Sequence, residues 1–216
     1  MTQGNVDLGE HEHSHDHHGP GHRSGLWDDE MAAWYAENHG SHATNCMTVE
    51  LARLEPNDVV VDIGCGSGEA VREAALRVTC GKAKGVDPSP AMIRIANELS
   101  ASHAGLSRIE FLEGPAENVP ISDGTASVVM AINSLHHWDD VQAGLAEVLR
   151  ILRPGGRLFV SEEELEDGQF GHGDGQLSNS TFVMRTIKGA GFAGVSLNQH
   201  SGDEASMLTV AACKEP

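Results

Sequence analysis

The sequence has few basic residues, few aromatic residues and no long apolar run. It contains 14 Lys and Arg against 32 Asp and Glu, which gives a formal net charge of -18 at pH 7. A protein that binds a phosphate backbone needs a basic surface, so this composition argues against a nucleic-acid partner. A small, neutral or cationic ligand fits the charge better.

Membrane-spanning and secretory segments are also missing from the sequence. No apolar stretch approaches the length that crosses a bilayer, and the polar N-terminus offers no apolar segment of the kind found in signal peptides. We therefore expect a cytoplasmic protein without a membrane partner. At 216 residues, 39% of them hydrophobic, the chain is long enough for one sizeable core, so we expect one domain with a tail.

Cysteine is scarce, and its spacing fits neither a zinc knuckle nor a disulfide framework. The four cysteines, Cys46, Cys65, Cys80 and Cys213, form no CxxC pair. Scattered cysteines are usually ordinary core or surface residues. The alternative for Cys46 and Cys213 is a thiolate pair that binds a soft metalloid acceptor.

The most informative segment joins an apolar run to a glycine-rich turn. Residues 59–63 suit a buried central strand of a parallel sheet, and glycines follow at 64, 66 and 68, where side chains would block a ligand. A dinucleotide fingerprint would need a third glycine where this chain has Glu69, and the Gly-Lys-Ser/Thr of a P-loop is absent. The turn is therefore predicted to bind a cofactor of another type.

A second strand, beginning near residue 83, ends in Asp87. This carboxylate follows the glycine turn by about 20 residues, where nucleoside-binding sheets hold the two hydroxyls of a ribose. Ser89 is a good N-cap and Pro90 a good first helical residue. Asp87 therefore either holds a ribose or helps to cap the helix that follows.

Strands and helices alternate along the rest of the chain. Strands are predicted at 108–112, 127–132 and 157–161, and a helix over 141–152 stops before Pro154-Gly155-Gly156. This alternation predicts an α/β fold with a parallel sheet, helices on both faces and ligands beyond the carboxyl ends of the strands.

Together these segments resemble the class I S-adenosylmethionine-dependent methyltransferases, in particular the UbiE-like branch that acts on small molecules. The resemblance extends from about residue 34 to the C-terminus. It implies a Rossmann-like, seven-stranded, mostly parallel sheet with a C-terminal antiparallel hairpin, here 195–198 with 207–212. The matching motifs are Val-Asp-Ile-Gly-Cys-Gly-Ser-Gly at 61–68, Gly-Val-Asp-Pro-Ser at 85–89, residues 114–119, Ser-Leu-His-His-Trp at 134–138, Leu-Arg-Pro-Gly-Gly-Arg-Leu at 152–158 and Lys-Gly-Ala-Gly-Phe at 188–192.

The resemblance implies S-adenosylmethionine as the cofactor and assigns its contacts. Asp62 would hydrogen-bond toward the amino group of its methionine part, directly or through water, and Asp87 would hold the ribose. Pro88 or Met92 would pack on the adenine, and the backbone around Ala116 would meet its edge. The residues assigned to the cofactor are Asp62, Gly64, Cys65, Gly66, Gly68, Asp87, Pro88, Met92, Ala116, Glu117 and Asn133.

Two positions depart from the family pattern. Pro115 stands where relatives commonly place an acidic residue that accepts a bond from the adenine amino group, so Glu117 becomes the alternative acceptor. Ala126-Ser127 stands where relatives often carry Phe-Asp, so a hydroxyl replaces a charged anchor.

The chemistry implied is methyl transfer to a small-molecule acceptor by in-line displacement from the sulfonium of the cofactor. The enzyme then supplies mainly proximity and alignment. An acceptor that must lose a proton also needs a base, and His136 or His137 is the candidate catalytic residue. The alternative is that this pair packs or shapes the cofactor pocket. A nicotinamide-dependent oxidoreductase is disfavoured by Glu69.

The first 24 residues are rich in histidine and carboxylates and cannot build a core. We expect a disordered tail that binds a divalent transition metal loosely. This composition supports an alternative function, a metal-binding or metal-responsive protein on a methyltransferase scaffold. The candidate ligands are His11, His13, His15, His17 and His18.

Residues 25–54 are predicted to form two helices, near 29–37 and 43–54, that cap the cofactor cleft ahead of the methyltransferase domain at 55–216. Trp34 and Tyr35 either contact the cofactor or acceptor, or anchor their helix to the core. His39 and His42 are tentative substrate residues, and with His136 or His137 they are also candidates for a metal site.

Residues 161–180 are polar, acidic and glycine-rich. We expect a loop at the mouth of the cleft that selects the acceptor, or else a solvated acidic surface. No large lid is inserted there, so the site is either open or completed by a second subunit in a homodimer.

Overall fold

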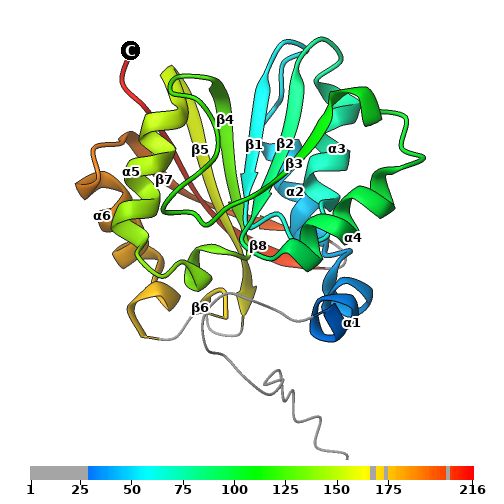
Figure 1. Cartoon of the computed structure of the whole chain (residues 1–216). Coiled ribbons are helices and arrows are strands. Elements are labelled where there is room, and N and C mark those ends of the chain that lie inside the picture. The colour runs from blue at the N-terminus through cyan, green and yellow to red at the C-terminus, as the bar shows by residue number, and fades with distance from the viewer. Residues whose placement is uncertain (1–28, 166–168, 173–174, 203–204) are drawn as a thin grey trace, which may run out of the picture.

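A computed structural model describes residues 29–165, 169–172, 175–202 and 205–216. Its middle layer is a twisted sheet with the strand order β3-β2-β1-β4-β5-β8-β7, and a short strand, β6, pairs with β5 off this path (Figure 1). The predicted sheet of seven main strands is therefore confirmed, with one short strand in addition. The strands are β1 (Val59–Ile63), β2 (Lys82–Asp87), β3 (Ile109–Glu113), β4 (Ala126–Ile132), β5 (Leu152–Leu165), β6 (Gln169–Phe170), β7 (Ala193–Ser201) and β8 (Ser206–Cys213).

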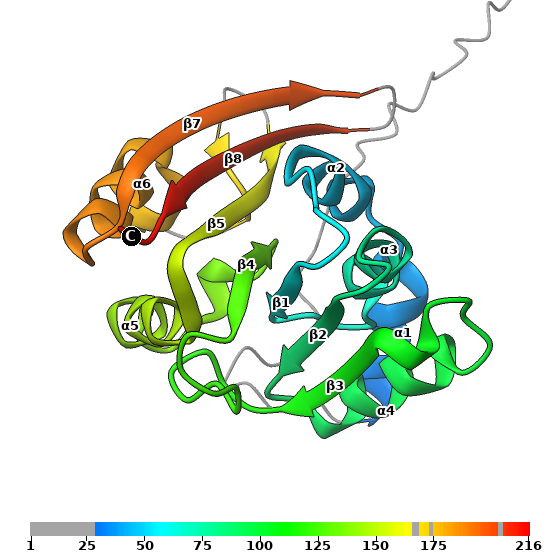
Figure 2. The same cartoon turned by 90° about the horizontal axis from the view of Figure 1, so that it is seen from above.

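Helices cover both faces of this sheet, as Figure 2 shows from above. One face carries α5 and α6, and the opposite face carries α2, α3 and α4. Strand β8 runs antiparallel to both of its neighbours, whereas β1 to β5 pair in parallel. The helices are α1 (Asp29–His39), α2 (Ala43–Leu51), α3 (Glu69–Arg77), α4 (Pro90–Ser100), α5 (Val141–Ile151) and α6 (Ser180–Gly189), with short 3-10 turns η1 (Leu106–Arg108), η2 (Leu135–His137) and η4 (Gly175–Ser178).

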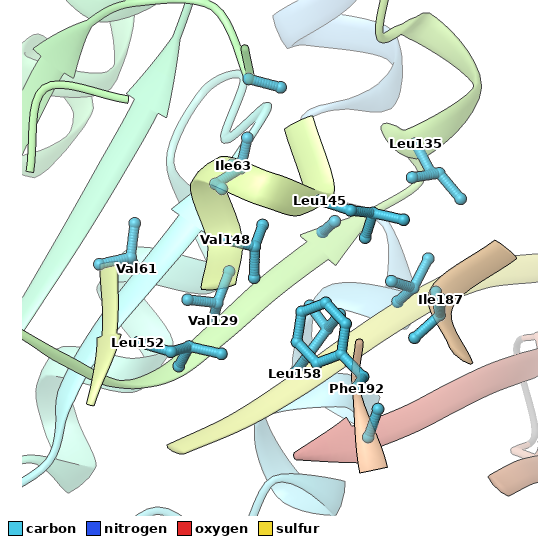
Figure 3. Close-up of a cluster of buried hydrophobic side chains, with 14 of the residues drawn as sticks. Val61, Ile63, Val129, Leu135, Leu145, Val148, Leu152, Leu158, Ile187 and Phe192 are labelled. Atoms are coloured by element: carbon cyan, nitrogen blue, oxygen red, sulfur yellow. The ribbon is translucent and has the colours of Figure 1, made fainter. Parts of the chain in front are cut away.

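The core divides in two because side chains alternate across each strand. On β4, Val129 and Ala131 face α5, while Val128 and Met130 face α2 and α3, and every residue of the strand is buried. Figure 3 shows the first cluster, in which Leu145 of α5 packs against the strands. Burial on both faces explains why the central strands appear in the sequence as continuous apolar runs.

Helix α1 lies beside α4, on the side of the sheet that carries α3 and α4 (Figures 1 and 2). It packs on α4 through Ala32 and Tyr35, which contact Ala91 and Met92 (Figure 1). Two helices are thus present where they were predicted, although α2 stops at Leu51 rather than near Leu54. That they cap the cofactor cleft stays a prediction.

The structure corrects the loop predicted at 161–180. Residues up to Leu165 continue β5, because they pair with β8, where Glu162 faces Leu208, and with β6, where Glu164 faces Phe170. Glu162 is 1% exposed, so the interpretation of this acidic run as a solvated surface is wrong for that residue.

The predictions for the N-terminal tail are not tested. His11, His13, His15, His17 and His18 lie outside the described residues. Within the described part of the chain, no helix is long and apolar enough to cross a membrane.

Candidate active site

The glycine-rich turn wraps around the end of β2. The N–H groups of Gly64 and Cys65 donate to the carbonyl of Val86 at 2.8 and 3.1 Å. Gly64, Gly66 and Gly68 have φ angles of +76°, +50° and +80°, which side chains disfavour. The backbone of this turn is therefore fixed in a conformation that the three glycines permit.

The three glycines differ in their surroundings. A Cβ on Gly64 would lie 2.6 Å from the Cβ of Ser134, and one on Gly68 would lie 2.5 Å from the ring of Phe111. A Cβ on Gly66 would meet nothing within 4 Å. Gly64 and Gly68 are thus required by packing, whereas Gly66 presents an open backbone that a ligand can approach.

Asp87, at the end of β2, holds this turn in place. It is 8% exposed, and its two carboxylate oxygens accept hydrogen bonds from the N–H of Gly66 at 3.0 Å and of Ser89 at 2.9 Å. Burial raises the pKa of the carboxyl, and these two hydrogen bonds partly oppose that rise. Each oxygen retains a lone pair for a further donor, such as a ribose hydroxyl.

The helix that follows takes its side-chain cap from Ser89. The hydroxyl of Ser89 accepts from the N–H of Met92 at 3.3 Å, and its backbone adopts the extended N-cap conformation. Asp87 also accepts a hydrogen bond at the start of this helix, from the N–H of Ser89. Asp87 therefore helps to order the helix start, as the alternative to ribose binding predicts, although Ser89 is the N-cap.

Asp62, at the end of β1, is a buried carboxylate with an unsatisfied oxygen. It is 3% exposed, and within the described residues its Oδ1 has no hydrogen-bond partner. Burial and, to a smaller extent, the charge of the nearby Asp87 together raise its pKa to about 7. A buried polar atom normally has a partner, so this oxygen fits a donor from a bound molecule, such as the amino group of S-adenosylmethionine.

Of the predicted adenine residues, Pro88 follows β2, Met92 lies in the first turn of α4 and Ala116 follows β3. Met92 and Ala116 are buried, and Pro88 is partly exposed. One oxygen of Glu117 accepts a hydrogen bond from the N–H of Asp140 at 2.9 Å. The second oxygen of this carboxylate is the one that could accept a bond from the adenine amino group.

Cys65 differs from the other residues of the turn, because its thiol is buried among side chains of the core that faces α3. A Cβ on Gly85 would lie 2.7 Å from its sulfur. Burial raises the pKa of this thiol, so its side chain serves packing and its backbone shapes the turn.

Asn133, just after β4, connects three elements. It adopts a φ of +48°, its Nδ2 donates to the hydroxyl of Thr44 at 2.8 Å, and its Oδ1 accepts from the N–H of Glu163 at 2.9 Å. The amide thus ties α2 and β5 to the end of β4. Its assignment to the cofactor stays a prediction.

The predicted histidine pair separates into a partly buried and an exposed ring. The side chain of His136 is 12% exposed, and its Nδ1 lies 3.3 Å from Oε1 and 3.2 Å from Oε2 of Glu162. His137 is exposed, and the two ring centroids lie 4.0 Å apart. Glu162, which the sequence interpretation missed, is therefore the carboxylate that orients His136.

Two predicted residues of the N-terminal helices also reach this region. Burial raises the pKa of Tyr35, and the negative charges of Glu162 and Asp87 add to that rise. His42 is the N-cap of α2, and its Nε2 lies 3.4 Å from Oε2 of Glu163. His172 contacts the same oxygen at 3.2 Å.

Within the described residues, the structure gives no contact that assigns Trp34 or His39 to the acceptor site. Trp34 is 50% exposed, and His39 ends α1. In the part of the chain that the structure describes, no group of three His, Cys, Asp or Glu could hold a metal ion. A metal site at His42 with His136 or His137 therefore gains no support, whereas the part assigned to His39 and the metalloid site at Cys46 and Cys213 stay predictions.

The carboxylate expected to be lost at Ser127 is replaced by that of Asp58, which lies just before the start of β1. The hydroxyl of Ser127 donates to Oδ1 of Asp58 at 2.7 Å and accepts from the N–H of Val59 at 2.9 Å. Asp58 in turn pairs with Arg157 at 3.3 Å. This network lies at the opposite end of the strands from Asp62, so it stabilises the sheet and not the site.

Comparison with known proteins identifies the domain. A family model described as a methyltransferase domain matches residues 61–160, which include the glycine turn and Asp87. The chain carries a class I S-adenosylmethionine-dependent methyltransferase domain. The residues fit that cofactor through the open backbone at Gly66, the free lone pairs of Asp87 and the unsatisfied oxygen of Asp62.

Relatives of this methyltransferase domain include enzymes with small-molecule names. The 27-O-demethylrifamycin SV methyltransferase of Amycolatopsis mediterranei is 34% identical over 64% of this chain and 49% of its own length. The ubiquinone/menaquinone C-methyltransferase UbiE of Geotalea daltonii is 27% identical over 53% of this chain and 49% of its own length. The chain thus spans about half the length of these curated relatives.

The fold is shared with solved methyltransferases. An S-adenosylmethionine-dependent methyltransferase from Aquifex aeolicus superposes with a TM-score of 0.72 at 19% identity. The match covers 87% of this chain and 98% of that protein. The likeness confirms the Rossmann-like architecture expected for the methyltransferase domain.

Proposed function

We propose that the chain is an enzyme that transfers a methyl group from S-adenosylmethionine to an oxygen atom of a small molecule by in-line displacement. The observation that carries this proposal is the buried, unsatisfied oxygen of Asp62 beside the open turn at Gly66. The cofactor supplies a methyl group already activated on a sulfonium, so the protein supplies binding, alignment and removal of a proton.

Proton removal is assigned to His136. If Nδ1–H donates to Glu162, then Nε2 is left as the hydrogen-bond acceptor of the neutral ring, which is the form that a general base needs. A buried carboxylate also stabilises the imidazolium that forms after proton transfer. His137 is exposed to solvent, so it is the weaker candidate.

Oxygen is the favoured acceptor atom for two reasons. A hydroxyl must lose a proton, which the His136–Glu162 pair is placed to accept, and the relative from Amycolatopsis mediterranei is named a 27-O-demethylrifamycin SV methyltransferase. A cytoplasmic location and the lack of a nucleic-acid partner remain proposals that rest on composition.

The cofactor site is tested by calorimetric binding of S-adenosylhomocysteine. We expect micromolar binding, which Gly66→Ala should abolish because its methyl group would occupy the ligand space. Gly124→Ala is the matched control, because Gly124 also has a positive φ, +62°, and open surroundings, but lies before β4 and away from the turn. Equal binding by both variants, or no binding by the unmodified chain at millimolar ligand, would contradict the proposal.

The reaction itself is tested with methyl-labelled S-adenosylmethionine and a panel of phenols, amines and thiols. We expect label to appear on phenolic or other hydroxyl oxygens. Transfer to sulfur or nitrogen alone would overturn the oxygen assignment while leaving the methyltransferase activity in place.

A further inference from the structure

The buried carboxylate of Glu162 is covered by the backbone of a glycine. Gly171 directly follows β6, the short strand that pairs with the end of β5 (Figure 1), and it is buried with a φ of +64°. A Cβ on Gly171 would collide with Oε2 of Glu162 and would lie 2.9 Å from its carboxylate carbon. A side chain at this position would therefore have to displace the carboxylate, so glycine is what allows the chain to pass so close.

The segment that contains Gly171 is held against the sheet by contacts on either side. Phe170 is 1% exposed and packs in the core on the α5 side of the sheet. The N–H of Gly171 donates to the carbonyl of Glu163 at 2.9 Å. The next residue, His172, places its Nε2 3.2 Å from Oε2 of Glu163. The cover over Glu162 is therefore tied to β5 by both backbone and side-chain contacts.

Among the described residues, His136 is the one hydrogen-bond donor to the carboxylate of Glu162. Its Nδ1 bonds to Oε1 at 3.3 Å. Oε2 lies 3.2 Å from the same nitrogen without hydrogen-bond geometry, and it has no other partner in the described part of the chain. Because Gly171 lies over this oxygen, solvent water has no access from that side. A buried carboxylate without water depends on its protein donors, so the bond from His136 is the one that stabilises its charge.

This dependence selects the tautomer of the His136 ring. A neutral imidazole carries one proton, and the hydrogen bond that one nitrogen makes decides where that proton lies. If water reached Glu162, the ring could carry its proton on Nε2 at little cost. With the carboxylate covered, Nδ1 must donate to it, and Nε2 stays free to accept a proton from an acceptor hydroxyl.

We propose that Gly171 is a positioning residue, which excludes water from Glu162 and thereby holds His136 in the Nδ1–H tautomer that a general base needs. The proposal deepens the proposed function and rests on its assignment of His136 as the base. Gly171 acts through its missing side chain, because the bare backbone covers the carboxylate without displacing it from the imidazole.

The test is NMR of the full chain with isotope-labelled histidine at about pH 8, where an ordinary imidazole is neutral. The signals of His136 are identified by their loss in His136→Gln. In the unmodified chain we expect the Nδ1–H form to predominate and its ring proton to exchange slowly with water. In Gly171→Ala we expect Nδ1–H to be no longer the major form, because the added methyl group displaces the carboxylate of Glu162.

Gly175→Ala is the matched control. Gly175 begins η4 and has a φ of +67°, but a Cβ there would meet nothing within 4 Å. Both alanines carry the cost of a positive φ, and only the one at 171 presses on Glu162. The control should keep the tautomer ratio of the unmodified chain. An equal change in the two variants would overturn the proposal, because backbone strain alone would then be sufficient.

His172→Ala is a second variant of the same segment, which removes the side-chain contact with Glu163 without filling any space. It should also lower the share of the Nδ1–H form, and it decides the matter if Gly171→Ala does not fold. The proposal is overturned if the ring of the unmodified chain is mainly Nε2–H, or if the folded variants at 171 and 172 keep the unmodified ratio.

This readout requires neither cofactor nor acceptor. Binding of S-adenosylhomocysteine is measured in parallel, and we expect it to be unchanged in the variants of this segment. A chain that shows the Nδ1–H form but does not bind S-adenosylhomocysteine would count against the methyltransferase proposal and not against the role of Gly171. A chain that binds this ligand with an Nε2–H ring would do the reverse.

Discussion

The carboxylate of Asp87 accepts a hydrogen bond from the backbone N–H of Gly66, 21 positions earlier in the chain, at 3.0 Å. The residue predicted to hold the ribose therefore also fixes the turn predicted to hold the methionine part of the cofactor. Because the other oxygen of Asp87 accepts from Ser89, one buried side chain couples β2, the glycine turn and the start of α4.

Asp87→Asn should weaken binding of S-adenosylhomocysteine more than tenfold and lower the free energy of unfolding by about 1 to 3 kcal/mol. An amide can accept from one of the two N–H groups, but its own NH2 then faces the other. Calorimetry and urea denaturation measure the two effects. Glu113→Gln is the control, because Glu113 faces Asp87 across β2 and β3 but is exposed. An equal loss of affinity in both variants would remove the special role of Asp87.

Asp62 should make the folded protein less stable as pH rises. Below its ordinary pKa of 3.8 both states are protonated, whereas between 3.8 and about 7 the unfolded state loses the proton that the folded state retains. The resulting loss of stability is about 3 kcal/mol from about pH 5 to about pH 8. Asp62→Asn should lack this part of the pH dependence when urea denaturation is compared with the unmodified chain. Identical slopes would show that Asp62 titrates normally.

The same titration should appear in cofactor binding. The ionised form of Asp62 attracts an amino group, so affinity for S-adenosylhomocysteine should increase as pH rises through about 7. Calorimetry of Asp62→Asn across the same range should show weaker binding without this increase. An affinity that is independent of pH in both proteins would argue that Asp62 does not contact the ligand.

The sequence was sufficient for the parts of the site that depend on local pattern. The strand at 59–63, the glycine turn and the strand-end Asp87 are encoded within short segments by apolar runs and positive-φ glycines, and the structure confirms their arrangement. The sequence also predicted that the glycine turn and Asp87 lie close together, because parallel strands end at the same edge of a sheet.

The parts that were missed depend on contacts between distant segments. Glu162 stands in a run of three glutamates, and its burial arises from pairing of β5 with β8 and β6, which the composition of the run does not reveal. Likewise, the partner of Ser127 is Asp58, 69 positions away, and the partner of Asn133 is Thr44, 89 positions away. A strand prediction extended past Ser161 would have placed Glu162 in the sheet.

Asn133 should be sensitive to substitution through both its backbone and its amide. Asn133→Gly accommodates the φ of +48° but loses the bonds to Thr44 and to the N–H of Glu163, so we expect a loss of about 1 to 3 kcal/mol. Asn133→Ala should lose about 1 kcal/mol more, because alanine disfavours positive φ. Denaturant unfolding of the two variants measures the difference. If the Asn133→Ala variant is as stable as the Asn133→Gly variant, the positive φ at this position contributes no strain.

His136 and His137 should differ sharply in turnover once an acceptor is found. Because His136 is held by Glu162, His136→Gln should lower kcat by about 10² to 10⁴ while leaving affinity for S-adenosylhomocysteine unchanged. His137→Gln should remain close to the unmodified enzyme, since that ring is exposed. Glu162→Gln should lower kcat and alter its pH profile, because a neutral amide no longer stabilises the imidazolium, whereas Glu164→Gln, the partly exposed neighbour, should not. Loss of turnover in the His137 variant with retention in the His136 variant would reassign the base and remove Glu162 from the reaction.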